Sequence, residues 1–229
     1  ITCRDWSSDV CSSDLPETYY SGLDLYLWIA SVLLCFILAL FFFIAAKKIS
    51  DIKSNRAMMN SFALFYVFMM LNKIAFFLSY FTAYYAEFLA VGYITATLSL
   101  FPLVYSYEKY LVQKTHFLFS IAIFFIIIFT SLVFIFPEEL EQIRNTTIML
   151  SFIPMAIILF IWLLAIKLTF GVLRKRAIWT LVGFACILAG YMLDSEMIIT
   201  MRIIPDEIAP ILFNIGLIVT CLAQLFKKE

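Results

Sequence analysis

The sequence predicts an all-α membrane protein, a bundle of seven transmembrane helices with the N-terminus outside and the C-terminus in the cytoplasm. Three observations support this: apolar residues make up 64% of the 229, they form long continuous runs, and basic residues gather in alternate loops. Soluble domains are about 45–50% apolar and about 25% charged, whereas this chain is 14% charged with a mean hydropathy of +1.01. A soluble core of this size could not bury so much apolar surface. A soluble protein, a disordered chain and a nucleic-acid binder are therefore excluded.

The first segment, Ile1–Leu15, differs from the rest of the chain because it is rich in Ser and Asp. It lacks the basic start and apolar centre of a signal peptide. Residues 5–15 (DWSSDVCSSDL) resemble the translated sequence of a short-read sequencing adapter. We expect 1–15 to be a non-native tail and 16–229 to be the seven-helix domain; the alternative is a genuine short extracytoplasmic tail.

Each predicted span follows from a run of roughly 20 predominantly apolar residues, which is the length that crosses a bilayer. The run HFLFSIAIFFIIIFTSLVFIF, for example, has no acidic residue, Lys or Arg, and charged segments such as Lys47–Arg56 and Arg174–Arg176 separate the spans. The runs are too long and too uniform for the alternating strands of a membrane barrel. The predicted spans are 23–46, 58–80, 84–106, 116–136, 147–168, 177–200 and 208–226.

Orientation follows from Lys and Arg in the short loops, which concentrate on the cytoplasmic side of membrane proteins. The loop after the first span, the boundary after the third, the loop after the fifth and the C-terminal tail are all basic. Acidic residues gather at the opposite ends. The same rule places aromatic belts at both interfaces. We expect Trp28 among the outer belt residues and Tyr105, Tyr107, Tyr110 and Trp179 in the inner belt, with Glu108 and Lys109 as a boundary pair.

Several kinds of chemistry are missing from the sequence. His116 is the one histidine, so the His, Cys and carboxylate clusters that bind zinc cannot form. The last span has no central Lys of the kind that binds retinal in microbial rhodopsins. Cys35, Cys186 and Cys221 fall within spans and are expected to be small packing residues. We therefore expect no metal, no cofactor and no enzymatic activity.

Ionisable side chains at membrane depth are costly and usually face the bundle interior with a partner. Lys73 in the second span and Asp194 in the sixth lie at matching depths below the outer face, so we predict an ion pair between them. Asn214 enters at the same depth, and Asn72 and Tyr191 are adjacent candidates. Glu196 points to another side of its helix.

Small residues predict where helices pack closely. Gly183, Cys186 and Gly190 fall on one face of the sixth span together with Asp194, and Gly92 and Ser99 belong to a similar face of the third. Two interpretations of the polar cluster remain open. It is either a structural device that fixes helix register, or an outward-open pocket or polar relay.

The arrangement as a whole resembles the seven-helix membrane sensor regions of prokaryotic receptors, which precede histidine kinase or cyclase domains. The resemblance covers 16–229 and rests on topology and on the local texture of Tyr107–Thr115 (YEKYLVQKT) and Leu188–Glu196 (LAGYMLDSE). It implies a sensory or signalling protein. The chain ends at Glu229 without an output domain, so we expect either a partner protein or a longer natural chain.

Three functions are compatible with the sequence. The first is a sensory domain that binds a small or lipophilic ligand at the polar cluster. Membrane lipids, or a cytoplasmic signalling partner bound through the basic loops, are its expected contacts. The second is a small transporter or channel, which would need a continuous polar path. The third, an intramembrane enzyme, lacks a nucleophile or a metal to accompany the acid–base groups.

Overall fold

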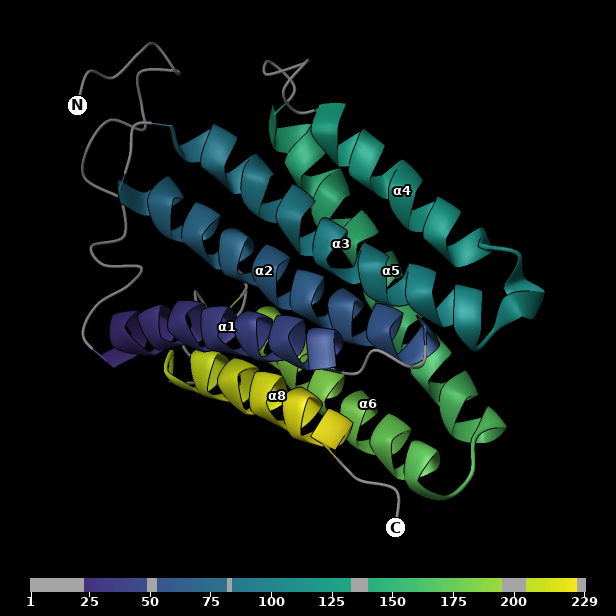
Figure 1. The fold of residues 1–229 in the computed structure, drawn as a ribbon. Coiled ribbons are helices and arrows are strands. Elements are labelled where there is room, and N and C mark those ends of the chain that lie inside the picture. Colours follow the sequence, from purple (N-terminus) through teal and green to yellow (C-terminus); the bar gives the residue numbers. More distant parts are fainter. Residues whose placement is uncertain (1–22, 49–52, 82–83, 133–139, 195–204, 226–229) are drawn as a thin grey trace, which may run out of the picture.

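The computed structural model describes residues 23–48, 53–81, 84–132, 140–194 and 205–225, and within these ranges the protein is a bundle of seven α-helices (Figure 1). The predicted all-α class is confirmed. The tail 1–15 and Glu196 lie outside the described residues. The helices are α1 (Leu23–Lys48), α2 (Lys53–Phe81), α3 (Tyr85–Tyr110), α4 (Leu118–Ser131), α5 (Leu140–Leu168), α6 (Gly171–Leu193) and α8 (Ile208–Leu225), with a short 3₁₀ turn, η1 (Gln113–Thr115), before α4.

Successive helices run in alternately opposite directions, so that short connections join neighbours (Figure 1). α1 packs on α2, α2 on α3, and α3 on both α4 and α5. α5 then packs on α6, and α6 on α8, whose contact with α1 closes the bundle. One end of the bundle is therefore acidic. It carries aspartates or glutamates from the start of α1, from the start of α3 and from just before α8, and α6 ends there too. The other end carries basic residues from the ends of α1, α3 and α5 and from the start of α6.

The helices are apolar nearly all round, which is typical of helices surrounded by lipid rather than water. Along α1 the buried side chains recur every three or four residues, from Asp24 through Trp28, Ser31 and Cys35 to Phe42, and so form one face. Large apolar residues such as Phe36 and Ile37 cover the opposite, exposed face. Five helices are long and apolar enough to cross a membrane, and α4 and the segment Ile153–Leu168 are shorter apolar helices.

Several helices extend beyond the predicted apolar spans. α2 begins at Lys53 rather than at residue 58, and α6 begins at Gly171 rather than at 177. Arg174–Arg176, predicted as the break between the fifth and sixth spans, lies inside α6, and the helical break falls at Thr169–Phe170. Lys and Arg are good helix formers, so a helix continues into its charged flank after the apolar run has ended. Gly171 adopts a left-handed conformation (φ +60°), which glycine tolerates, and this turns the chain into α6.

Aromatic rings fill the centre of the bundle. Phe42 of α1 stacks on Phe62 and Tyr66 of α2, with centroids 5.3 and 5.5 Å apart. Phe65 meets Phe184 of α6 edge to face at 5.3 Å. The buried Tyr66 hydroxyl donates a hydrogen bond to the carbonyl of Leu217 in α8 (3.1 Å). The hydroxyl therefore has a partner, and α2 is tied to the helix that closes the bundle.

α6 and α8 approach each other closely through glycines. A Cβ placed on Gly183 would lie 2.9 Å from the Gly216 carbonyl oxygen, and one on Gly190 would lie 2.8 Å from that of Ala209. These are the close backbone approaches that small residues permit. The predicted packing role of Gly183 and Gly190 agrees with this geometry. Cys186 is only half buried, and Ile187 takes its place against Gly216, because the packed face follows a spacing of four and then three residues.

A buried carboxylate organises the turn between α3 and α4. Glu108 is 2% exposed and accepts hydrogen bonds from the backbone N–H groups of Phe119 (3.0 Å) and Ser120 (2.8 Å), and from the Ser120 hydroxyl. It therefore satisfies donors that a helix N-terminus leaves free, and its negative charge complements the helix dipole. Glu108 and Lys109 lie in the last turn of α3, at the predicted end of the helix, but Glu108 is buried against the start of α4 while Lys109 is exposed. Tyr107, predicted for the inner belt, is likewise buried, with its ring 4.4 Å from that of Trp162.

Candidate functional site

The most unusual group in the described bundle is the ammonium of Lys73, which α2 places among aromatic rings. Its Nζ lies 3.4 Å from the ring centroid of Trp28 (α1), 4.4 Å from that of Tyr191 (α6) and 4.8 Å from that of Phe213 (α8). The Lys73 side chain is 4% exposed. We call Trp28, Tyr191 and Phe213 the aromatic cage. A ring face attracts a cation, and the attraction is stronger where water is excluded, so the cage offsets part of the cost of burying the charge.

The predicted partner of Lys73 is in place. Asp194 Oδ2 lies 3.4 Å from Lys73 Nζ, close enough for a salt bridge and a long hydrogen bond. Asp194 is the C-terminal cap residue of α6, directly after its last helical turn, and its side chain is 16% exposed. The pair therefore links the later part of α2 to the end of α6. Because Lys73 is the more deeply buried partner, loss of Asp194 would leave a charge stranded in the interior.

Trp28 has a different place from the one that the sequence suggested. It was predicted for the outer aromatic belt, but it is 5% exposed and packs against Phe213 with ring centroids 5.5 Å apart. The indole Nε1 has no hydrogen-bond partner among the described residues. The prediction treated Trp28 as an isolated boundary residue. Its spacing from Asp24, Ser31 and Cys35 assigns it instead to the packed face of α1.

Asn72 and Tyr191 form a second link behind the cage. The Asn72 amide donates to the carbonyl of Gly92 in α3 (2.8 Å), and its carbonyl oxygen accepts a hydrogen bond from the Tyr191 hydroxyl. Tyr191 thus contacts Lys73 with its ring and Asn72 with its hydroxyl. Three helices, α2, α3 and α6, are joined by this network. Gly92 is buried under Phe76, and Ser99, further along α3, donates to the Ala96 carbonyl of its own helix at 2.6 Å.

Asn214 and Asp24 complete the cluster at the end of the bundle that is predicted to face outside. Asn214 Nδ2 donates a hydrogen bond to the Leu27 carbonyl of α1 (3.3 Å). Asn214, which was predicted to share the cluster with Lys73, is therefore joined to Lys73 only indirectly, through the neighbouring turn of α1. Asn214 Oδ1 and Asp24 Oδ1 have no partner among the described residues. Asp24, which is 6% exposed, lies within electrostatic range of Lys73 and Asp194. From the sequence, Asp24 is expected only among the acidic residues of the outer side, although its spacing from Trp28 assigns it to the packed face of α1.

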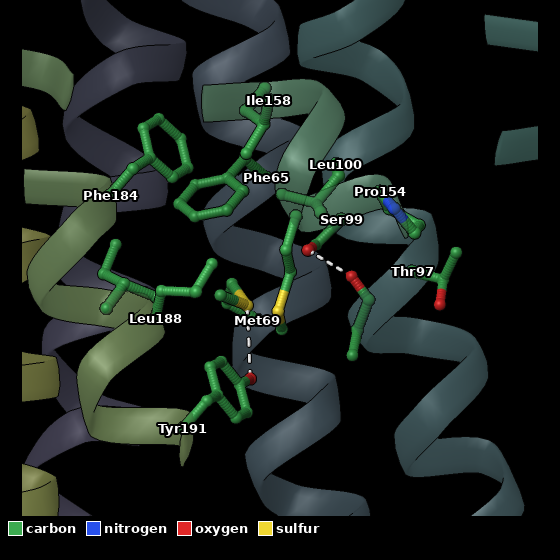
Figure 2. Close-up of a pocket in the computed structure, with 13 residues that line it drawn as sticks. Phe65, Met69, Thr97, Ser99, Leu100, Pro154, Ile158, Phe184, Leu188 and Tyr191 are labelled. Atoms are coloured by element: carbon green, nitrogen blue, oxygen red, sulfur yellow. Dashed lines mark hydrogen bonds between the residues drawn. The ribbon is translucent and has the colours of Figure 1, made fainter. Parts of the chain in front are cut away.

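Two spaces adjoin the cluster. The first lies between α2, α3, α5 and α6, beside Tyr191, Met69 and Phe65 (Figure 2). It leaves only about 30 Å³ for water-sized molecules, which suffices for a water but not for an organic ligand. The second, which we call the α1–α2 groove, has about 210 Å³. Its lining residues are Trp28, Ile29, Val32, Lys73, Ile74, Phe76, Phe77 and Leu78.

The polar groups do not continue through the bundle as a path. Beyond the cage, the described interior between α1, α2 and α6 is mainly apolar and combines aliphatic side chains with rings such as Phe42, Phe62 and Phe184. Further polar links between helices are isolated: Ser61 and Ser106 join α2 to α3 with 2.5 Å between the hydroxyl oxygens, and Gln224 of α8 donates to the Thr180 hydroxyl of α6 at 2.8 Å. Within the described residues, no set of His, Cys, Asp and Glu could hold a metal ion. The site is therefore a localised charged cluster at one end of an apolar bundle.

No family model, no curated protein and no solved structure matches this chain. The class of protein consequently rests on the fold. Five helices of membrane-spanning length, with their apolar faces turned outward, define a multi-pass integral membrane protein.

Proposed function

We propose that the protein is a sensory or signalling membrane domain in which the Lys73–Asp194 pair is the element that a ligand switches. The observation that carries the proposal is the placement of Lys73, a buried ammonium in an aromatic cage with one carboxylate partner 3.4 Å away at the end of α6. Polar bonds between membrane helices contribute on average well under about 2 kcal/mol of stability. A buried Lys is thus a costly way to gain stability alone, which favours a functional role.

The position of Asp194 gives the pair a route to the rest of the molecule. Asp194 caps α6, and α6 packs closely on α8 through Gly183, Gly190 and Gly216. A ligand that binds better when the pair is open shifts the population by its difference in affinity between the two states. Release of Asp194 frees the end of α6, and the close α6–α8 contact passes the displacement to the opposite, basic end. That end could engage anionic lipids or a cytoplasmic partner.

A transporter or channel is the alternative function. The interior of the bundle supports it less well than it supports a sensory domain. Transport needs polar groups along the whole path, whereas the described interior beyond the cage is mainly aromatic and aliphatic, with only isolated Ser and Thr hydroxyls. Vesicles that contain the purified protein should take up protons or small solutes no faster than empty vesicles. Flux above that background that disappears in Lys73→Met would support transport and overturn the sensory proposal.

The sensory proposal has a positive test at Cys221, which is 7% exposed and lies in α8 towards the basic end. In a variant with Cys221 as the only cysteine, we measure its labelling rate by a membrane-permeant maleimide in nanodiscs. Asp194→Asn should raise the rate several-fold, because opening the pair loosens the α6–α8 contact and exposes the thiol. The matched control is Asp206→Asn, which removes an exposed charge from the same end. Equal rates in all three proteins would reduce the pair to a structural role.

A further inference from the structure

We propose that Asp24 is a proton-binding site, and that the proton it holds is the ligand that keeps the Lys73–Asp194 pair closed. The proton comes from water at the acidic end of the bundle and returns there when the pH at that end rises. This inference names the ligand of the proposed sensory site, and so rests on that proposed function.

The Asp24 carboxyl is buried without a hydrogen-bond donor. The residue is 6% exposed although it lies in the first turn of α1, and its Oδ1 has no partner among the described residues. Asn214 Oδ1, on the neighbouring α8, is a second buried acceptor without a partner there, and the amide of the same side chain is bound to the carbonyl of Leu27. An ionised carboxylate only accepts hydrogen bonds, whereas a protonated one also donates. A proton on Asp24 therefore supplies a donor to a region where two acceptors stand without one.

The charges of the buried groups do not balance. Lys73 is the one buried ammonium among the described residues, and Asp194 already holds it at 3.4 Å. Asp24 adds a second carboxylate, and Asp206 and Glu207, from the segment before α8, lie within electrostatic range of it. These four side chains are the charged groups that act on Asp24 from α2, from the end of α6 and from the start of α8. An unpaired carboxylate that is buried beside like charges takes up a proton rather than remaining ionised.

A proton suits this position better than a metal ion does. Hard metal ions need several oxygen ligands at once, whereas a proton needs a single oxygen. Across the described helices, no set of His, Cys, Asp and Glu could hold a metal ion. The single orphaned oxygen of Asp24 is sufficient for the proton.

Asp24 lies where its ionised form competes for Lys73. Trp28, whose ring centroid is 3.4 Å from Lys73 Nζ, follows Asp24 by four residues on the same buried face of α1, so the two side chains lie on adjacent turns. Once Asp24 has lost its proton to water, two carboxylates attract one ammonium on a flexible stem, and the long contact with Asp194 weakens. The proton thus favours the closed pair, and its loss favours the open one by the difference in proton affinity between the two states.

Infrared difference spectroscopy of the full chain in nanodiscs tests the proton directly. Raising the pH from about 6 to about 9 should remove a carboxylic-acid C=O band from the wild type, because exposed carboxyls are ionised throughout this range. The band should be missing in Asp24→Asn and present in Glu87→Gln, which removes an exposed carboxylate from the same end. A wild-type spectrum without such a band, or a band that persists in Asp24→Asn, would overturn the inference.

The Cys221 labelling rate tests the switch. At each pH, the rate of the protein with an intact cluster is divided by the rate of Asp24→Asn, both with Cys221 as the only cysteine, so that the pH dependence of the thiol chemistry cancels. Because Asn resembles the protonated carboxyl, this ratio should rise several-fold over the same pH range. The corresponding ratio for Glu87→Gln should not change with pH.

The outcomes separate this inference from the sensory proposal. An Asp24→Asn ratio that stays constant with pH, while Asp194→Asn still increases labelling, would overturn the proton as the ligand and leave the sensory proposal standing. If Asp194→Asn leaves labelling unchanged, the sensory proposal falls, and the infrared band would still establish the buried proton. Replacing Na⁺ with choline at constant pH should alter neither readout. A choline effect that matches the effect of alkaline pH would assign the site to a metal cation and overturn the inference.

Discussion

The burial of the Lys73 ammonium depends on side chains that neighbouring helices supply. A charged side chain within a bilayer is costly, up to about 2.5–3.5 kcal/mol at the centre on insertion scales, and here three rings and one carboxylate offset the cost for Lys73. The ring of Trp28 makes the closest aromatic contact. Because the rings come from α1, α6 and α8 while Lys73 belongs to α2, the charge can be accommodated only when all four helices are assembled.

The Lys73–Asp194 pair should be measurable as a coupling energy. Asp194→Asn leaves Lys73 without its carboxylate, and we expect a lower melting temperature in detergent and a loss of about 3 kcal/mol. Lys73→Met should cost less, because Asp194 is partly exposed and can reach water. The double variant should be more stable than the sum of the two changes indicates. Thermal unfolding of the wild type, the two single variants and the double variant checks this. An unchanged melting point in Asp194→Asn would show that the pair does not stabilise the protein.

Glu108 offers a second prediction for a single residue. Glu108→Ala removes the acceptor for the first backbone N–H groups of α4, so we expect destabilisation by about 1–2 kcal/mol. Hydrogen exchange of the Phe119 and Ser120 amides should accelerate in the same variant. Glu87→Ala is the matched control, because Glu87 is an exposed carboxylate on the same helix. Equal effects of the two substitutions would show that the hydrogen bonds from Glu108 to α4 do not contribute to stability.

At the scale of the elements, the close contact of α6 and α8 is the most sensitive interface. Gly183→Leu would drive a side chain into the backbone around Gly216, and we expect a loss of at least about 2 kcal/mol. Ala185→Leu is the control, since Ala185 lies on the exposed face of the same helix turn. Thermal unfolding in detergent compares the two. Similar stability in both variants would contradict a close glycine contact.

The elements also show what the sequence could and could not predict. Long apolar runs specify the helices because a chain in lipid must satisfy its backbone internally, and this requirement does not depend on tertiary detail. The Lys73–Asp194 pair was predictable because depth can be counted along a helix. The cap role of Glu108, the burial of Trp28 and the half-buried Cys186 depend on helix rotation and on a neighbour's position. Uniformly apolar helices carry almost no signal for that rotation.

At the scale of the whole molecule, the two ends of the bundle differ in charge. Asp24, Glu87, Asp194 and Asp206 lie at one end, and Lys47, Lys109, Lys167 and Arg174 at the other, because successive helices alternate in direction (Figure 1). This separation turns a formal net charge of zero into a strongly polar arrangement. The sensory proposal needs it, since the ligand site and the basic end then lie at opposite ends of the bundle.

Orientation in the membrane is the prediction that belongs to this scale. Short loops rich in Lys and Arg remain in the cytoplasm, so we expect the basic end inside and the cluster of Lys73 and Asp194 towards the outer face. Reporter fusions after Ala46 should be active as cytoplasmic reporters, and fusions after Phe136 as external ones. Replacing Lys47, Lys48, Lys53 and Arg56 with Gln should weaken this asymmetry, whereas replacing Arg144 and Arg202 should not. Fusions at the two positions that report the same compartment would contradict an alternating seven-span topology, and the outer placement of the cluster would fall with it.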